Sequence, residues 1–291
     1  TTAAQANLAV NKSVNYTASR NLVPASSTQV SNWADWRNVI CFVADDGDQN
    51  EHLNTAERCA AIVQEANKNI NLDKIYSDAF PQKSNSGGQR YPAVTTAIND
   101  RMDRGSLFLT YVGHSGKDGW AHERILEFSD INNWHNTYNQ PVIMTLSCDF
   151  AWYDRAMVSP AEACFFNTNG GSMALITTSR VAYGGSNSTY ARKLFGRLFT
   201  TAGNNHRTMG EMNMLAKNDY GGNSDAISMF VLIGDPSMPL AVPKYKVVID
   251  SVNGMPANAL TDTLKALSQV MVKGHVTDAQ GNALNDFNGN L

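Results

Sequence analysis

The stretch NVICFVADDGDQNEHLNTAERCAAIVQEANKNINLDKIYSDAF at residues 38–80 sets the fold. It begins with an apolar, strand-like run at 38–44, continues with a helical pattern at 52–68 and returns to a strand-like run at 72–80. Strands that alternate with helices are typical of parallel sheets, because each helix carries the chain back to the starting edge of the sheet. We therefore predict an α/β fold.

The same alternation continues along the chain. Helical patterns follow at 91–105, 128–136, 159–168 and 188–202, and strand-like runs at 106–114, 141–148 and 171–179. Each strand-like run ends in polar or glycine-containing sequence. We predict an open, mostly parallel sheet flanked by helices, with a ligand crevice along the carboxyl ends of its strands.

Three regions of the chain differ in pattern. Residues 1–37 are polar and show no sustained period, which favours a lead-in or linker. Residues 38–243 carry the alternation of strands and helices. Residues 244–291 alternate like half-buried antiparallel strands, and we predict an incomplete, immunoglobulin-like β-sandwich there. We expect the chain to be a piece of a longer protein.

Composition excludes several classes of protein. Hydrophobic residues make up 43% and charged residues 17% of the chain, as in folded globular domains. The balance of 23 basic and 26 acidic residues gives a net charge of −3 without a basic run, so we expect no nucleic-acid partner. No stretch of about 20 apolar residues occurs, and the first ten residues lack the features of a signal peptide.

Cofactor motifs are missing from the sequence. The four cysteines, Cys41, Cys59, Cys148 and Cys164, have no CxxC spacing, so a zinc knuckle is not indicated. Neither a phosphate-binding GxxxxGK[ST] motif nor a dinucleotide-binding GxGxxG motif follows a predicted strand. We expect no cofactor and no metal ion. The disulfide state of the cysteines stays open.

Two chemically reactive residues follow neighbouring predicted strands. His114 lies in YVGHSGKDGW and Cys148 lies in TLSCDF. A neutral imidazole close to a thiol can accept its proton, and the resulting thiolate is a strong nucleophile. This pattern favours a cysteine nucleophile with a histidine base. Two alternatives stay open: Cys148 as a small core residue, and His114 as a turn residue.

Several motifs resemble those of a known family. They are GHSGKDGW at 113–120, PVIMTLSCDF at 141–150, AEACFF at 161–166, GGSMALITTSR at 170–180 and LIGDPSMPLAVP at 232–243. Together they resemble the gingipain family of caspase-fold cysteine peptidases over residues 38–243. More narrowly, VADDGDQNEHL at 43–53, RYPAVTTAINDRMDRG at 90–105 and the FNG-containing tail resemble the PorU-type sortases of the type IX secretion system of Bacteroidetes.

The resemblance implies a function. It implies a caspase-like fold and a catalytic dyad of His114 and Cys148 that cleaves a peptide bond through a thioester. For the sortase branch it implies removal of C-terminal secretion signals from cargo proteins and transfer of the cargo to an amine on anionic lipopolysaccharide. It also implies other outer-membrane proteins of that system as partners, and a cell-surface location at the outer membrane. Alternatives are a secreted endopeptidase that uses water and a catalytically silent binding module.

Other residues are candidates for supporting roles. The backbone N–H groups near Ser115, Gly116 and Cys148 are expected to hold the oxyanion formed when the thiolate attacks a carbonyl. Among the acids after the first strand, Asp45, Asp46 and Asp48, we favour Asp46 for orienting the imidazole. The alternative is a solvated acidic turn that caps the next helix.

The same loop offers a calcium alternative and the other loops offer substrate contacts. Asp46, Asp48, Asn50 and Glu57 have EF-hand spacing, but Glu51 stands where that loop needs glycine. The candidate substrate-binding residues are Trp120, Glu123, Phe150, Trp152 and Arg180, with His122, Tyr153, Asp154 and Tyr183 near them. Such aromatic residues could instead close the edge of the core. His52, His135, His206 and His275 are given no role.

Overall fold

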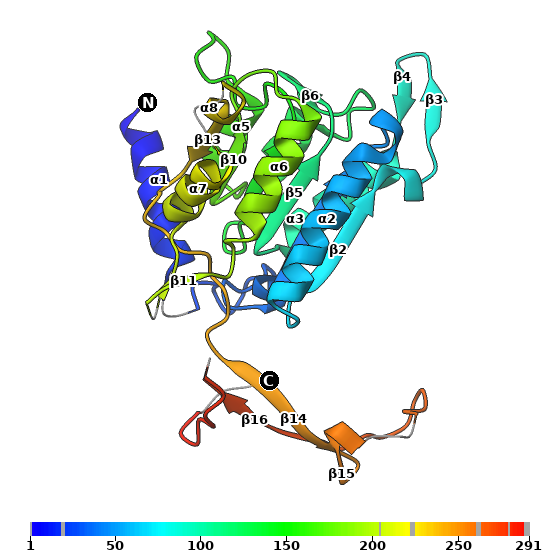
Figure 1. The fold of residues 1–291 in the computed structure, drawn as a ribbon, viewed down its shortest axis with the longest axis vertical. Coiled ribbons are helices and arrows are strands. Elements are labelled where there is room, and N and C mark those ends of the chain that lie inside the picture. The colour runs from blue at the N-terminus through cyan, green and yellow to red at the C-terminus, as the bar shows by residue number, and fades with distance from the viewer. Residues whose placement is uncertain are drawn as a thin grey trace. The chain divides into compact units, whose positions relative to one another are not determined.

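Six short strands, most of them apolar, form the central sheet of the larger part of the chain. The computed structural model describes residues 2–18, 21–203, 205–221, 225–259, 263–278 and 280–287. The strands are β1 (Val39–Ala44), β2 (Asn71–Tyr76), β5 (Phe108–Val112), β9 (Val142–Leu146), β10 (Ala174–Thr178) and β13 (Phe230–Ile233). Their order is β13-β10-β9-β5-β1-β2, and only the β10–β13 pair is antiparallel (Figure 1). The predicted open, mostly parallel sheet is confirmed.

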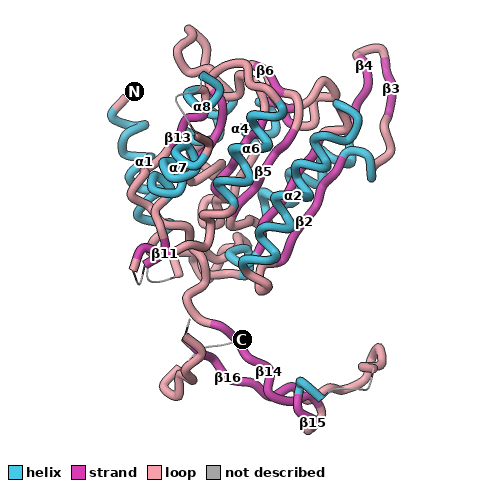
Figure 2. Tube along the Cα trace, in the orientation of Figure 1, coloured by secondary structure: helices cyan, strands magenta, loops and turns pink. Residues whose placement is uncertain are grey.

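Helices cover both faces of this sheet because side chains alternate between the faces along each strand. On one face, Phe195 of α6 (Gly184–Phe195) packs with its ring centroid 5.4 Å from that of Phe42 and 5.6 Å from that of Phe108. The helices α2 (Glu51–Ala66) and α7 (Met209–Asp219) lie beside α6 in this layer (Figure 2).

The other face carries the second helical layer. The strand residues that alternate with Phe42 and Phe108, such as Cys41 and Leu109, join a buried apolar cluster with helices α3, α4 and α5. These helices are α3 (Pro92–Arg104), α4 (Phe128–Asn133) and α5 (Pro160–Phe166). The remaining elements of the larger part are β3 (Lys83–Asn85), β4 (Gly88–Arg90), β6 (Ser115–Gly116), β7 (Gly119–Trp120), β8 (Leu126–Glu127), β11 (Thr201–Ala202), β12 (Asn205–His206) and α8 (Asp225–Ser228).

The first residues form a helix where the sequence predicts a linker. Helix α1 (Ala3–Tyr16) begins with a capping box between Thr2 and Gln5. The ammonium of Lys12 is buried and donates to the carbonyl oxygens of Gly170, at 2.7 Å, and Ser172, at 3.0 Å. Residues 1–37 therefore belong to the same compact unit, Thr1–Ala241, as the sheet. The sequence analysis missed helix α1 because its apolar residues form only a weak amphipathic pattern.

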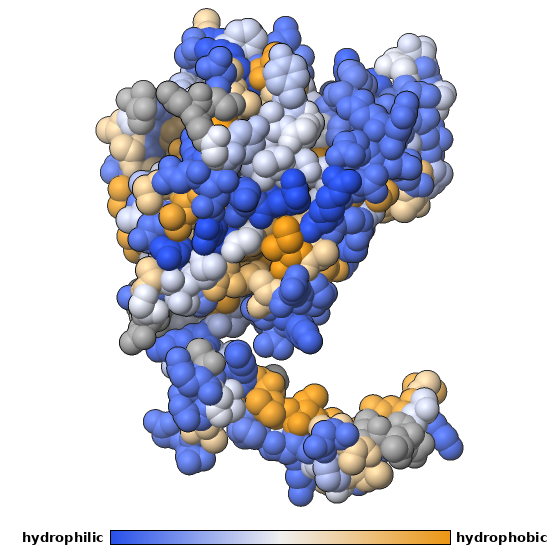
Figure 3. All heavy atoms as spheres, in the orientation of Figure 1, coloured by the Kyte–Doolittle hydropathy of each residue, from blue (hydrophilic) through white to orange (hydrophobic). Residues whose placement is uncertain are grey.

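Residues Val242–Leu291 form a second compact unit. Its strands β14 (Lys246–Val252), β15 (Met255–Pro256) and β16 (Val272–Thr277) make an antiparallel sheet in the order β15-β14-β16. Apolar side chains of these strands, including Val247, Ile249 and Val272, are exposed, and they give the unit its apolar surface (Figure 3). Three antiparallel strands occur in many folds, so the immunoglobulin-like sandwich stays a prediction. Residues 288–291 of the predicted tail lie outside the described residues.

The loops after β1, β5, β9 and β10 leave the same edge of the sheet, because these four strands are parallel and adjacent. The polar and glycine-containing residues that follow these strands therefore lie at this edge. Among the helices of the described residues, none has both the length and the apolar character needed to cross a bilayer.

Candidate active site

His114 and Cys148 occupy equivalent positions just after two adjacent strands. Strands β5 and β9 pair in parallel with Val112 opposite Leu146, a register offset of 34 residues (146 minus 112). The same offset separates His114 from Cys148 (148 minus 114), and each residue lies two positions beyond the last pair. Neighbouring strands are about 4.8 Å apart. The sheet therefore brings the imidazole-bearing loop and the thiol-bearing loop side by side.

Hydrogen bonds join these loops to their neighbours. The hydroxyl of Ser115 donates to the carbonyl oxygen of Cys148, and that of Thr178, at the end of β10, donates to the carbonyl oxygen of Ser147. The Cys148 sulfur lies 3.4 Å from both the backbone nitrogen and the backbone oxygen of Ala182. The candidate nucleophile is thus held between the loops that follow β5 and β10.

Cys148 differs from the other three cysteines in exposure. The four cysteines, all within the described residues, are free thiols, but only Cys148 is partly exposed. Burial raises the pKa of Cys59 to about 12 and raises the pKa values of Cys41 and Cys164 well above that of a free thiol. A thiol that stays protonated is a poor nucleophile. The chemistry available to sulfur in this chain is therefore concentrated at Cys148.

The backbone of His114 is fixed by a buried carboxylate. Its N–H donates to Oδ2 of Asp45 at 2.9 Å, and its carbonyl oxygen accepts from the hydroxyl of Tyr111 at 2.6 Å. Asp45 is 3% exposed and also accepts from the backbone N–H of Gly47 at 3.0 Å. These bonds connect the end of β1 to the end of β5.

The ring of His114 faces the loop after β1. Its Nε2 lies 3.4 Å from Oδ1 of Asp48, and the ring centroid lies 5.1 Å from that of His52 and 5.2 Å from that of His122. Among the hydrogen bonds of the described residues, none joins this ring to the thiol of Cys148. Catalytic hydrogen bonds are often open in a site without substrate, so this does not remove the pair from consideration.

The three acids after β1 have separate roles. Asp45 supports the backbone of His114, whereas Asp46 accepts a hydrogen bond from the hydroxyl of Tyr91 at 2.7 Å. Burial raises the pKa of Tyr91, and the bond to Asp46 raises it further. The carboxylate beside the His114 ring is that of Asp48. The geometry therefore favours Asp48 over Asp46 as the acid next to the imidazole.

The calcium alternative finds no support in the position of Glu57. Its carboxylate accepts from the ammonium of Lys74 at 2.7 Å and from the hydroxyl of Tyr76 at 2.8 Å. The bond to Lys74 lowers the pKa of Glu57, and the bond to Tyr76 adds to the effect. Glu57 is thus paired with strand β2, away from the acids of the loop.

The carboxylate of Glu123 lies close to those of two of the loop acids. One carboxylate oxygen each of Asp45, Asp46 and Glu123 lies within 4.8 Å of the others. Burial raises the pKa of Glu123, and the negative charges of Asp46 and Asp45 raise it further. The sequence singled out these residues for separate reasons and gave no sign that they would meet.

Two of the predicted substrate-binding residues are buried in the core. Trp120 and Phe150 have no exposed surface. The indole of Trp120 stacks on the ring of Tyr111 at 4.4 Å between centroids, and its centroid lies 5.7 Å from that of Phe150. These rings help to close the core below the loops, which is the alternative that the sequence left open, and Trp120 also lines a pocket beside His114.

Trp152 and Arg180 are exposed or partly exposed, as a substrate contact requires. The guanidinium of Arg180 lies 2.5 Å from the carboxylate of Asp154 and 5.6 Å from the ring centroid of Trp152. The loops after β9 and β10 therefore meet through these three side chains. Tyr153 and Tyr183 are exposed on the same two loops.

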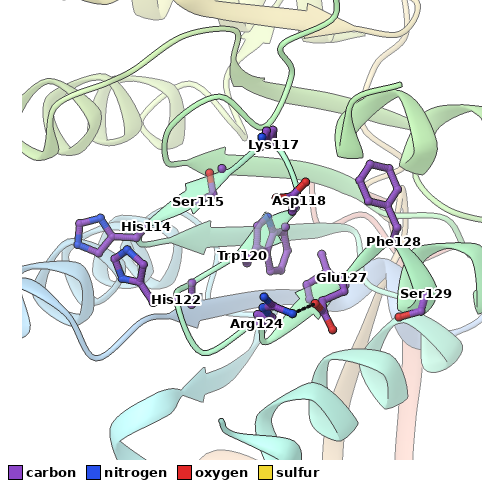
Figure 4. Close-up of a pocket in the computed structure, with 14 residues that line it drawn as sticks. His114, Ser115, Lys117, Asp118, Trp120, His122, Arg124, Glu127, Phe128 and Ser129 are labelled. Carbon is purple, nitrogen blue, oxygen red and sulfur yellow. Dashed lines mark hydrogen bonds and ion pairs between the residues drawn. The ribbon is translucent and has the colours of Figure 1, made fainter. Parts of the chain in front are cut away.

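A pocket of about 730 Å³ lies beside His114. The loop after β5 forms most of its wall, with His114 and His122 at one end and Phe128 and Ser129 at the other (Figure 4). Ser115 and Gly116, the predicted oxyanion donors, line this pocket near His114. Its position makes it a candidate site for part of a substrate or for an acceptor.

His52 is a residue that the sequence analysis missed. It is 7% exposed, and its Nε2 lies 3.4 Å from Oδ2 of Asp48. Burial lowers the pKa of His52; the charge of Asp45 opposes this shift, and His114 adds to it. No clear signal in the sequence pointed to this pair, because Asp48 precedes helix α2 and has a left-handed backbone rather than a helical one.

Comparison with solved structures shows the same fold in known peptidases. The chain matches the Arg-specific cysteine proteinase gingipain R (RgpB) with a TM-score of 0.62 and 15% identity, over 84% of this chain and 55% of that one. It matches the complex of Porphyromonas gingivalis RgpB pro- and mature domains with a TM-score of 0.61 and 15% identity, over 83% and 56%. A third structure, described only as a protease, matches with a TM-score of 0.60 and 13% identity, over 96% and 65%.

The chain thus spans between 55% and 65% of the length of these solved structures. No curated protein sequence matches it at the level of significance required. The model of peptidase family C25 matches residues 1–241, which is the whole of the larger unit. The chain belongs to peptidase family C25.

Proposed function

We propose that this chain is the catalytic region of a cysteine peptidase in which Cys148 is the nucleophile and His114 the general base. The observation that carries the proposal is the register of β5 and β9, which gives the two residues equivalent positions just after adjacent strands. The bond from the Ser115 hydroxyl to the Cys148 carbonyl supports it, because it ties the two loops together. Membership of peptidase family C25 supports the same chemistry.

The first half-reaction forms a thioester. His114 turns from Asp48 toward Cys148 and accepts the thiol proton, and the thiolate attacks the carbonyl carbon of the scissile peptide bond. The tetrahedral oxyanion is held by backbone N–H groups near Ser115, Gly116 and Cys148. The C–N bond then breaks, and the imidazolium of His114 returns the proton to the departing amine.

The second half-reaction uses an acceptor. An amine loses its proton to His114 and attacks the thioester carbonyl, and Cys148 leaves as a thiolate. We propose that the acceptor is an amine on anionic lipopolysaccharide and that the departing segment is the C-terminal secretion signal of a cargo protein. The motifs at 43–53 and 90–105, which resemble PorU-type sortases, support this finer assignment. Water in place of the amine gives the hydrolytic alternative.

The proposed function includes a cellular location and protein partners. It is proposed to act at the cell surface, in association with the outer membrane and with other proteins of the type IX secretion system. Trp152, Arg180 and Glu123 are proposed to contact the substrate, because they are at least partly exposed on the loops around Cys148 and His114.

The products of one incubation test both half-reactions. The chain is incubated with a cargo protein that carries its C-terminal signal, with and without a soluble primary amine, and the products are weighed by mass spectrometry. We expect cleaved cargo in both cases and an amide adduct when amine is present. Cleavage without adduct would reject the transferase assignment and leave a hydrolase.

Two variants complete this test. Cys148→Ala is expected to remove all cleavage, whereas Cys59→Ala is its control, since the buried Cys59 has no part in the reaction. Cleavage that persists in Cys148→Ala would reject the proposed nucleophile. An intact substrate with folded wild-type chain would favour a silent binding module.

A further inference from the structure

Three side chains, one of them that of His114 from the proposed dyad, form an arrangement suited to a metal ion. Asp48, His52 and His114 each offer one ligand atom, and these atoms all lie within 4.8 Å of one another. They come from the loop after β1, the first turn of α2 and the loop after β5. Imidazole nitrogen and carboxylate oxygen are the ligands that zinc and similar divalent metals accept.

The distances within this cluster fit coordination better than hydrogen bonding. His52 Nε2 lies 3.4 Å from Oδ2 of Asp48, and His114 Nε2 lies 3.4 Å from Oδ1 of the same carboxylate. That separation exceeds the usual 2.7–3.2 Å of an N–H···O bond. In a tetrahedral site with metal–ligand bonds of about 2.0–2.1 Å, neighbouring ligand atoms lie about 3.3 Å apart.

The second ring nitrogen of His52 is buried and faces a carboxylate. His52 is 7% exposed, and its Nδ1 has no hydrogen-bond partner among the described residues. This nitrogen faces Oδ2 of the buried Asp45 at 4.0 Å. A metal-bound histidine commonly directs its second ring nitrogen at a carboxylate, which orients the ring and strengthens its binding.

The loop after β1 lets the two histidine rings come close together, and the cluster is open to solvent. A Cβ at Gly47 would lie 3.2 Å from Cδ2 of His114 and 3.3 Å from Cε1 of His52, so glycine lets both rings approach the loop. The side chains of Asp48 and His114 are 59% and 42% exposed. An ion from solution can therefore reach the ligand atoms.

We propose that Asp48, His52 and His114 bind one divalent transition-metal ion of the Zn²⁺ class, with water completing the coordination. The sequence analysis expected no metal and gave His52 no role. The bound ion occupies Nε2 of His114. If His114 is the base of the proposed function, on which this consequence rests, the ion inhibits the enzyme reversibly by holding the ring away from Cys148.

Calorimetric titration of the metal-stripped full chain with ZnCl₂ tests the binding directly. We expect one ion per chain. Asp48→Asn, which removes the charge at an exposed position, is expected to weaken binding at least about tenfold, since even an outer-shell partner is worth 10- to 100-fold. His52→Gln should weaken it similarly. The matched control is His275→Gln, which breaks an exposed histidine–aspartate pair with Asp250 at 2.9 Å and should leave binding unchanged.

Two further arms separate the possible failures. Cys148→Ser should bind zinc like the wild-type chain, because the thiol is not a ligand; loss of binding there with binding retained in Asp48→Asn would overturn the site. No one-to-one binding by the wild-type chain, or wild-type affinity in Asp48→Asn, would also overturn it. Zinc that binds but does not slow cleavage would reject the role of His114 as base and leave the metal site standing.

Discussion

The backbone N–H of His114 donates to the buried carboxylate of Asp45 across 2.9 Å, and this bond joins the end of β5 to the end of β1. The same carboxylate accepts from the N–H of Gly47, whose loop carries Asp48. Asp45 therefore sets the position of the imidazole without contacting its ring nitrogens. Asp45 thus supports the backbone of His114, whereas Asp48 faces its ring.

Asp45→Asn tests whether the buried carboxylate of Asp45 supports the backbone of the two loops. The amide keeps one acceptor oxygen in place of two, and its NH₂ group meets the backbone N–H of either Gly47 or His114. Because hydrogen bonds to a buried charge contribute about 1.5–3 kcal/mol, we expect the free energy of unfolding to fall by about that amount. Urea denaturation measures it, with Asp100→Asn, at an exposed helix position, as control. Equal losses in both variants would contradict the role of Asp45.

Ser115→Ala tests the link between the histidine and cysteine loops. The variant keeps the backbone N–H that is proposed to hold the oxyanion and removes the hydroxyl bond to the carbonyl of Cys148. A hydrogen bond contributes about 0.5–1.5 kcal/mol, so we expect kcat/KM to fall up to about tenfold. Ser115→Thr, which retains a hydroxyl, should recover most of it. Ser84→Ala, on the exposed β3–β4 hairpin, should change nothing; a similar loss there would show that the effect is not local.

Lys12→Met tests the docking of α1 through the pH dependence of stability. Burial lowers the pKa of Lys12 to about 7 from an ordinary value of 10.5, although the nearby Cys164 opposes the shift. Between these values the unfolded chain binds one more proton than the folded chain, so Lys12 makes stability rise with pH, by up to about 1.4 kcal/mol per unit. Below pH 7 both states are protonated and this dependence ends.

The variant is expected to remove that slope. Free energies of unfolding at pH 7.5, 8.5 and 9.5 should rise less steeply in Lys12→Met than in the wild-type chain, by about one proton. Lys68→Met, at an exposed position, should keep the wild-type slope. Parallel curves for the wild-type chain and Lys12→Met would mean that Lys12 is charged in the folded state.

The sheet was predictable because its strands are short apolar runs bounded by polar sequence. The runs predicted at 106–114 and 141–148 contain β5 and β9, and their parallel pairing follows from the helices between them. That register also explains why the positions of His114 and Cys148 after predicted strands indicated a pair, which the family resemblance then made specific. Helix α1 was missed because its docking depends on a buried lysine rather than on an apolar stripe.

Side-chain direction was the part that sequence could not supply. Asp45, Asp46 and Asp48 are nearly adjacent, yet one contacts the backbone of His114, one contacts Tyr91 and one faces the His114 ring. The backbone conformation of the loop decides where each carboxylate points. Asp48 has a left-handed φ of 53°, which could not be predicted from the sequence. The burial of Trp120 and Phe150 was not predictable for a related reason, since aromatic residues after a strand can turn inward as easily as outward.

The rate of alkylation of Cys148 by iodoacetamide at pH 6.5 tests the central claim most directly. An isolated thiol is almost wholly protonated at this pH and reacts slowly. If His114 accepts the thiol proton, the wild-type chain should react at least about tenfold faster than His114→Ala, while His135→Ala, at an exposed position on another loop, should match the wild type. Equal rates in the wild-type chain and a folded His114→Ala would contradict the pairing of His114 with Cys148.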